Sequence, residues 1–240
     1  MSTTGGHEKG AALAAFAEGL WLAEGPVVSV AGFRYPTRMA VARLADASLF
    51  IWSPVALSPE LREEVSALGQ VGHIVSPNSL HHLHLAAWKA AFPAARLHAS
   101  PGLRQKRKDL TFDAELGDDP DPAWQGQLDQ VIVRGNLITS EVVFFHRESG
   151  TVLFTDLLQN FPQGWHRGWR SVVARMDRMV GPQPQVPQKF RVAFVNRPAA
   201  RESLGRIHAW PALNVVMAHG TPVIGNGAEF IRQAFSWLMR

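Results

Sequence analysis

The 240-residue chain contains no cysteine. This absence excludes disulfide bonds, thiolate metal sites and cysteine nucleophiles together. Any bound metal ion must therefore be held by His, Asp, Glu or Asn side chains. Such nitrogen and oxygen donors favour zinc, iron or manganese over iron–sulfur chemistry. The lack of disulfides also fits the cytoplasm, which is the location we expect.

Long apolar runs are missing as well. None approaches the roughly 18–20 residues that a membrane-spanning helix needs. The amino terminus lacks the basic start and apolar core of a signal peptide. We therefore expect no membrane association.

Hydrophobic residues make up 46% of the chain, which is enough for a substantial core. We expect residues 1–10 to be disordered and residues 11–240 to form a single domain.

Several familiar enzyme motifs are also absent. The chain has neither a G-x-G-x-x-G fingerprint nor a Walker loop, so nucleotide binding through those loops is unsupported. It has no G-x-S-x-G sequence, which marks the nucleophile of many hydrolases. The chemistry must come from other residues.

Basic residues gather in residues 165–206, where nine Arg or Lys stand against two acids, Asp177 and Glu202. Such a stretch can bind phosphates or nucleic acid. The alternative is a solvated helix whose apolar residues pack inward at helical spacing. We favour this alternative and expect no nucleic-acid partner, while a homo-oligomer remains open. The residues expected to pack inward are Trp165, Trp169, Val172, Val173, Met176 and Met179.

Short apolar runs separated by Gly, Pro and Ser predict the remaining elements. Ser58 and Pro59 are typical of a helix start, and Gly69 ends that helix. Strand meanders followed by alternating strands and helices favour an α+β or layered αββα domain over a Rossmann sheet. We expect strands at 27–31, 39–44, 48–52, 73–75, 96–99, 130–134, 141–146, 151–155 and 213–217, and further helices at 79–92, 199–207 and 229–238.

Three of the ten histidines, His81, His82 and His84, lie within four positions after an apolar run. Neutral imidazole is the commonest metal-binding side chain, and a strand-to-helix junction can place several around one ion. The alternative is a helix whose histidines face water or cap other groups. Two more candidates follow apolar strands: Asp156, whose buried charge would need a partner, and His219.

The order of these motifs resembles the metallo-β-lactamase fold superfamily. The matching segments are 76–84, 142–156 and 215–222. Within the superfamily, Ser53-Pro54, Pro77-Asn78, His81-His82, Glu141–His146 and Thr155-Asp156 resemble an uncharacterised bacterial family that forms a divergent branch. The resemblance implies an α+β fold, specifically a four-layer αββα sandwich.

The chain departs from the superfamily's metal motif. No H-x-H-x-D-H sequence is present: placing its first His at Asn78 puts Leu80 at the second. The superfamily's next His, which precedes the hairpin formed by strands 141–146 and 151–155, would fall near Asn136 or Leu137 in this chain. Asp156 and His219 do fall where the superfamily has its bridging Asp and last His. The resemblance therefore implies one rearranged, mononuclear site with an open position for water. Its candidate metal ligands are His81, His82, Asp156 and His219, with either His81 or His82 joining Asp156 and His219, because adjacent residues of a helix point in different directions.

The function that follows is a metallo-hydrolase-like protein that activates water on an unknown small-molecule substrate. Asp156 and His82 are the candidate catalytic residues, and zinc, iron or manganese is the candidate cofactor. Asn78, His84 and Glu141 would hydrogen bond to ligands or replace them, although His84 better fits a structural role. The alternative is a metal-free, degenerate member that acts as a binding or structural protein.

Overall fold

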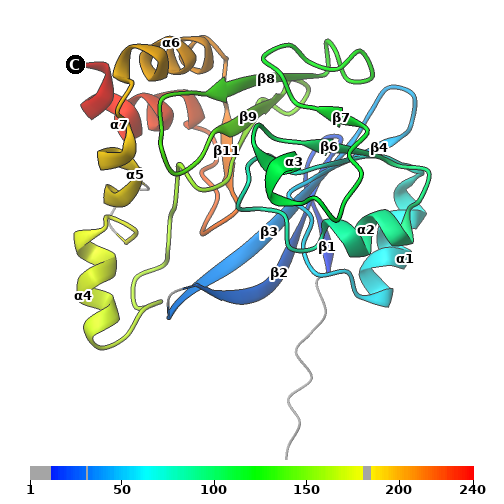
Figure 1. The fold of residues 1–240 in the computed structure, drawn as a ribbon, viewed down its shortest axis with the longest axis horizontal. Helices are drawn as coiled ribbons and strands as arrows, with labels where there is room; N and C mark the ends of the chain where they lie inside the picture. Colours follow the sequence, from blue (N-terminus) through cyan, green and yellow to red (C-terminus); the bar gives the residue numbers. More distant parts are fainter. Residues whose placement is uncertain (1–11, 31, 181–184) are drawn as a thin grey trace, which may run out of the picture.

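The computed structural model describes residues 12–30, 32–180 and 185–240. The expectation of disorder over residues 1–10 lies outside these residues. In the described part the strands form two sheets, with helices on either side (Figure 1). None of the described helices combines the length and apolar character needed to cross a lipid bilayer.

The first sheet holds the amino-terminal half of the chain. Its strands follow one another in chain order, antiparallel from the first to the fourth and parallel from there on. The parallel connections carry helices. The strands are β1 (Leu13–Ala17), β2 (Leu20–Val30), β3 (Phe33–Arg43), β4 (Leu49–Trp52), β5 (Val71–Val75), β6 (Arg96–Ala99) and β7 (Ala114–Glu115). The helices are α1 (Pro59–Leu68), α2 (Leu85–Ala91) and α3 (Leu103–Lys106).

The second sheet has the order β11-β10-β9-β8. Its last strand in the chain joins β10 in parallel after a long helical excursion. The strands are β8 (Leu128–Val133), β9 (Glu141–His146), β10 (Thr151–Phe154) and β11 (Asn214–Met217). The helices of this half are α4 (Trp169–Met176), α5 (Gln188–Ala193), α6 (Arg197–His208) and α7 (Gly227–Met239).

Alternating side chains of β9 show why the sheets stack. Val142 and Phe144 pack into the core between the two sheets, against residues such as Phe50. Val143 and Phe145 point the other way, into a core shared with the carboxyl-terminal helices. Because successive residues of a strand face opposite sides, a strand buried on both faces must be apolar throughout.

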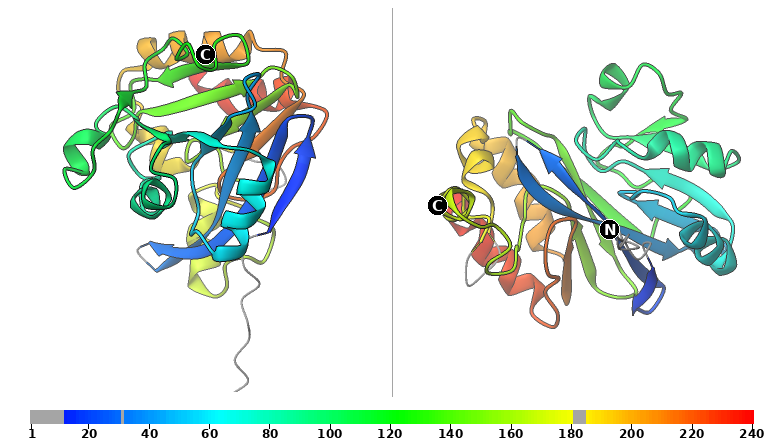
Figure 2. Two further views of the ribbon diagram at one scale, coloured as in Figure 1. Left: turned by 90° about the vertical axis from the view of Figure 1, so that its right-hand side faces the viewer. Right: turned by 90° about the horizontal axis from the view of Figure 1, so that it is seen from below.

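A third core joins the outer face of the first sheet to α1, α2 and α3. Helices therefore flank both sheets, α1–α3 on one side and α4–α7 on the other (Figure 2, right). This confirms the α+β fold with its αββα layers. Most expected strands are present within one or two residues of their predicted bounds, and Ser58 caps α1 by accepting a hydrogen bond from the Leu61 amide at 3.2 Å.

The helix expected at 79–92 is wrong in its first half, because α2 begins only at Leu85. Asn78 Oδ1 accepts hydrogen bonds from the amides of Leu80 and His81, and Ser76 Oγ donates to the His81 carbonyl. These side chains compete with helical hydrogen bonding and fold the segment into turns. His81 and His82 therefore lie in a loop rather than on a helix.

The inward packing expected for the basic segment is also wrong in part. Met179 is buried with Phe161 and Ala174, and Trp165 packs against them. The large apolar side chains of α4 are exposed to solvent, and the buried residue of this helix is the small Ala174. The exposed side chains are Trp169, Val172, Val173 and Met176.

Candidate metal centre

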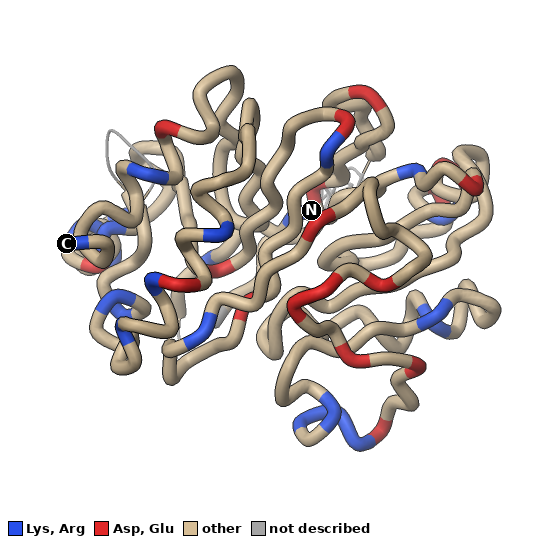
Figure 3. The backbone as a smooth tube through the Cα atoms, turned by 90° about the horizontal axis from the view of Figure 1, so that it is seen from above, with Lys and Arg blue, Asp and Glu red and all other residues tan. Residues whose placement is uncertain are grey.

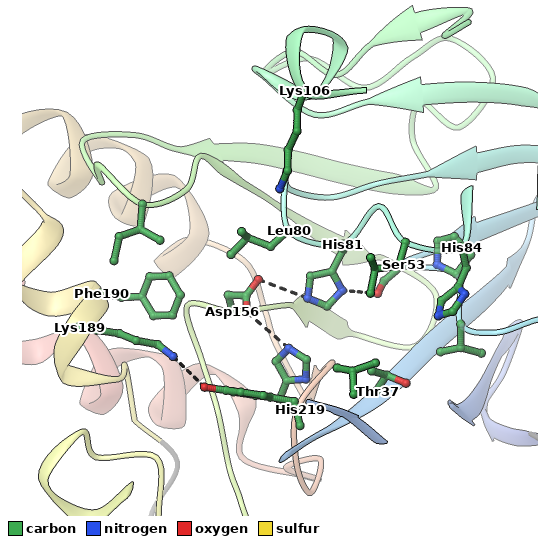
Figure 4. A pocket seen from close by; sticks show the side chains of 16 residues that line it. Thr37, Ser53, Leu80, His81, His84, Lys106, Asp156, Lys189, Phe190 and His219 are labelled. Atoms are coloured by element: carbon green, nitrogen blue, oxygen red, sulfur yellow. Dashed lines mark hydrogen bonds and ion pairs between the residues drawn. The ribbon is translucent and has the colours of Figure 1, made fainter. Parts of the chain in front are cut away.

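Three side chains from distant parts of the chain meet at one edge of the two sheets. His81 lies in the loop after β5, Asp156 follows β10 and His219 follows β11. His81 Nε2 lies 3.3 Å from Asp156 Oδ2, and His219 Nε2 lies 3.4 Å from Asp156 Oδ1. Asp156 and His219 are buried, His81 is partly buried, and both imidazoles point toward the carboxylate (Figure 4).

The other ring nitrogen of each histidine is held by the protein. His81 Nδ1 lies 2.8 Å from Ser53 Oγ, and His219 Nδ1 lies 2.6 Å from the Pro36 carbonyl oxygen. A carbonyl only accepts, so His219 Nδ1 carries the hydrogen. The 3.4 Å between His219 Nε2 and Asp156 Oδ1 is then bridged either by a hydrogen on Nε2 that is donated to the carboxylate or by a cation that the Nε2 lone pair binds.

This geometry fits a metal ion. A tetrahedral ion with bonds of about 2.0–2.1 Å sets its ligand atoms about 3.3–3.4 Å apart. Each imidazole lies at that spacing from one oxygen of Asp156, His81 from Oδ2 and His219 from Oδ1, and one ligand atom from each residue lies within 4.8 Å of the others. Hydrogen bonds to the far nitrogens orient the rings, as is usual for metal-binding histidines.

Asp156 is supported by Asn78, whose side-chain amide donates to Oδ2 at 2.7 Å and to Thr155 Oγ1 at 2.8 Å. Burial alone raises the pKa of the Asp156 carboxyl. The charge of His81 and the hydrogen bonds from His219 and His81 outweigh burial and hold this pKa well below its usual range. The carboxylate form is thus the stable one. Asn78 Oδ1 accepts hydrogen bonds from the Leu80 and His81 amides and is therefore not free to bind a metal ion. Asn78 thus supports the ligands and does not replace a ligand.

Glu141 has a similar supporting place. It is fully buried at the start of β9 and accepts hydrogen bonds from the amides of Thr155, Asp156 and Leu157 at 2.7, 2.8 and 3.0 Å. Burial and the negative charge of Asp156 raise the pKa of Glu141. Its oxygens point at these amides and thereby hold in place the backbone that carries Asp156.

The structure does not bring His82 to this cluster. Its Nδ1 lies 3.1 Å from Arg107 Nη1, and its carbonyl accepts a hydrogen bond from the same guanidinium. Burial and the nearby charges of Lys106 and Arg107 lower the pKa of His82. His84 precedes α2 and lines the cavity beside the cluster, yet its Nε2 has no hydrogen-bond partner among the described residues.

Three contributions escaped sequence reasoning. Ser53 holds His81 from a left-handed backbone conformation with φ of 52°. Such a conformation is strained for a residue other than glycine and is often found at functional sites. The Pro36 carbonyl orients His219, and Arg38 donates to the carbonyls of Met217 and Gly220 on either side of it. Ser53-Pro54 was part of the family resemblance, but nothing in the sequence marks a carbonyl or a distant arginine.

A cavity of about 370 Å³ opens next to the three side chains. Its walls are mostly apolar, and the amines of Lys106 and Lys189 flank it (Figure 4). Lys189 Nζ lies 3.0 Å from the Tyr35 hydroxyl. The apolar wall residues include Val28, Val55, Leu80, Leu83, Ile138 and Phe190.

Solved structures of metallo-beta-lactamases and a flavodiiron protein share this fold. The metallo-beta-lactamase from Pontibacter korlensis aligns with a TM-score of 0.62 and 12% identity over 96% of this chain and 99% of its own. FIM-1 from Pseudomonas aeruginosa, in its mono-zinc form, aligns with a TM-score of 0.64 and 12% identity over 95% of each chain. A metal-soaked Flv1 flavodiiron core from Synechocystis sp. PCC6803 gives a TM-score of 0.63 and 12% identity over 95% of this chain, which spans 61% of that core.

At such identities these likenesses establish the fold alone, which is the metallo-β-lactamase fold that the sequence motifs resemble. No curated protein matches the chain. A family model does match, over residues 20–166. That span contains Asn78, His81, Glu141 and Asp156 and leaves His219 outside it. Since the match covers more than half of the sequence, the chain belongs to the family described as "Domain of unknown function (DUF4336)".

Proposed function

We propose that the protein is a metal-dependent hydrolase with one divalent ion, zinc foremost, held by His81, Asp156 and His219. The observation that carries the proposal is the pair of imidazole Nε2 atoms facing one carboxylate, with each far nitrogen already engaged. Three protein ligands leave a position open for water, as in catalytic zinc sites. A bound ion of this kind supplies hydroxide near neutral pH by lowering the pKa of its water.

The chain's own residues would then prepare the reaction. Ser53 and the Pro36 carbonyl hold the two imidazoles in their ligating orientation, and Asn78 holds the carboxylate. The apolar cavity walls exclude bulk water, which strengthens electrostatic interactions at the site. Lys106 and Lys189 bring positive charge to the cavity and can bind an anionic part of the substrate.

The substrate that suits this cavity is a small molecule with an apolar portion beside its hydrolysable bond. Apolar lining with a few polar groups is the usual composition of small-molecule sites. The reaction itself is not specified by the fold, because one scaffold can host unrelated chemistries.

Metal content tests the proposal directly. We expect protein purified without a nickel column and then incubated with zinc to retain about one ion per chain after gel filtration. Asp156→Ala and His219→Ala should lose the ion, because each removes a ligand. His82→Ala, the matched control from the same loop, should keep it, because His82 bonds to Arg107 instead.

Chelation provides the second measurement. Removing a bound ion should lower the melting temperature of the parent and hardly change that of Asp156→Ala, since ligand binding to the native state stabilises it. Less than about 0.2 ion per chain after zinc addition, with no effect of chelator, would overturn the proposal. The metal-free binding protein would then be the better description.

A further inference from the structure

Helix α4 turns its apolar side to solvent. Trp169, Val172, Val173 and Met176 stand at i, i+3, i+4 and i+7, which places them on one face of the helix. Their exposed fractions are 61, 56, 38 and 74%. Within α4 only Ala174 is buried, on a different face. We call these four exposed side chains the α4 stripe.

The stripe is fixed in its outward direction. The Trp169 ring meets Phe33 edge-on at a centroid distance of 5.9 Å, and Arg170 Nε donates to the Gly32 carbonyl at 2.9 Å. Ala174 packs with Phe161 at the other side of the helix. The helix is thus tied to the start of β3, at the outer end of the molecule (Figure 1).

The surroundings of the stripe are basic. Arg167, Arg170, Arg175 and Arg178 are all exposed. The one acid between residues 164 and 180 is Asp177, which accepts a hydrogen bond from the Lys189 amide at 2.8 Å. From residue 165 to the end, eleven Lys or Arg stand against three acids. Figure 3 shows more basic than acidic positions around the carboxyl terminus, which lies with α6 and α7 at the end of this half of the molecule away from α4 (Figure 1).

The sequence-based expectation of no membrane association rests on the lack of spanning helices and does not bear on a surface helix. We propose that the α4 stripe docks the protein on a bilayer surface that contains anionic lipids. Apolar side chains of an amphipathic helix enter the boundary between headgroups and acyl chains, and tryptophan favours that depth. Arginines beside them attract the negative surface of the bilayer. The combination of an outward apolar face and a basic rim is complementary to such a surface.

Other occupants match the observations less well. A second copy would bring arginine against arginine, and four side chains fall far short of the roughly 800 Å² per partner of a stable protein interface. A nucleic acid would use Trp169 and the arginines, but Val172 and Met176 offer neither stacking nor hydrogen bonds to it.

Docking would bring the cavity close to the membrane. Phe33, which contacts Trp169, and Tyr35, which lines the cavity, stand two residues apart on β3 and therefore share a face. Substrate could then enter directly from the lipid phase. The docking inference itself stands without the metal site.

Vesicle flotation tests the proposal on the full chain. We expect the parent to float with vesicles of equimolar phosphatidylcholine and phosphatidylserine and to stay behind with phosphatidylcholine alone. Val172→Asp with Met176→Asp should weaken binding about tenfold or more, because charge replaces the apolar face. Arg167→Gln with Arg175→Gln should weaken it about tenfold, and added salt should do the same.

The matched control is Val195→Asp with Ile224→Asp, which adds the same charge at exposed aliphatic positions outside α4. It should bind nearly as the parent does, and all variants should keep the parent's melting temperature. Failure of the parent to bind anionic vesicles would overturn the proposal, as would equal binding by the stripe variant and the parent. Tight DNA binding or dimer formation without vesicle binding would reassign the surface.

Discussion

Asn78 donates a hydrogen bond to Asp156 Oδ2 at 2.7 Å, the same oxygen that His81 Nε2 approaches at 3.3 Å. Through its own oxygen, Asn78 also holds the backbone amide of His81. One buried amide side chain therefore positions two candidate ligands at once.

Replacing Asn78 by Leu should damage folding and metal binding together. The variant leaves Asp156 Oδ2 and the His81 amide without this partner, and we expect the free energy of unfolding to fall by about 2–4 kcal/mol. Zinc affinity should fall about 10–100-fold, as for other residues that orient ligands. Urea unfolding and zinc titration measure the two effects. Asn226→Leu, at an exposed position without a capping hydrogen bond, is the control. Unchanged zinc affinity would contradict the role given to Asn78.

Gly220 allows the chain to turn directly after His219. Its φ is 115°, and a Cβ there would collide with the Asn160 carbonyl group. We expect Gly220→Ala to lower the free energy of unfolding by about 3 kcal/mol and to weaken zinc binding, because the strained loop carries His219. Gly225→Ala provides the comparison, since its φ is also positive but a Cβ there meets nothing within 4 Å. Thermal unfolding measures the loss of stability in both variants. Equal losses in Gly220→Ala and Gly225→Ala would show that the collision with Asn160 is relieved.

Arg38 is buried and donates to the carbonyls of Met217 and Gly220, each at 2.5 Å. It also bonds to Glu24 at 2.7 Å. Arg38→Met should lower the free energy of unfolding by about 3 kcal/mol and zinc affinity about tenfold, because the loop bearing His219 loses its anchor. Calorimetric zinc titration measures the second effect. The control is Arg43→Met, whose guanidinium bonds to a single exposed carbonyl. If Arg38→Met loses stability but binds zinc like the parent, Arg38 is only structural.

Stability should fall in mild acid through His98. Burial, followed by the charge of neighbouring His73, lowers the pKa of His98 to about 4. The folded state therefore keeps His98 neutral, whereas the unfolded chain takes up a proton below about pH 6.5. The contribution of neutral His98 to the free energy of unfolding is fully present above about pH 6.5 and is lost as the pH falls toward 4. The loss amounts to about 3 kcal/mol.

Urea unfolding at about pH 7.5 and about pH 4.5 checks this dependence. The pKa of His98 also depends on the charges of Asp121, Arg96 and Asp113. These residues are therefore left unchanged, and the parent is compared with a variant of His98 alone. His98→Gln should be less stable than the parent at neutral pH and should lose less stability on acidification. Parallel pH profiles for parent and variant would contradict the assignment.

Local sequence determined most of the fold. Ser58 and Pro59 mark the start of α1, and the apolar residues 141–146 form a strand buried on both faces. These elements depend on capping, turn chemistry and apolar alternation between near neighbours, which a sequence displays directly. The superfamily order of motifs then indicated how the strands are stacked. The same motifs placed Asp156 and His219 at strand ends that share one edge of the fold.

Tertiary structure alone decided which histidine joins them. His81 and His82 are adjacent and chemically equivalent in the sequence, but Asn78 fixes a turn that sends His81 to Asp156 and leaves His82 beside Arg107. Helical spacing likewise identified the apolar face of α4 without revealing its direction. Whether that face meets the core or the solvent depends on contacts between residues far apart in the chain, such as Phe33 and Trp169. Spacing along one segment carries no information about such contacts.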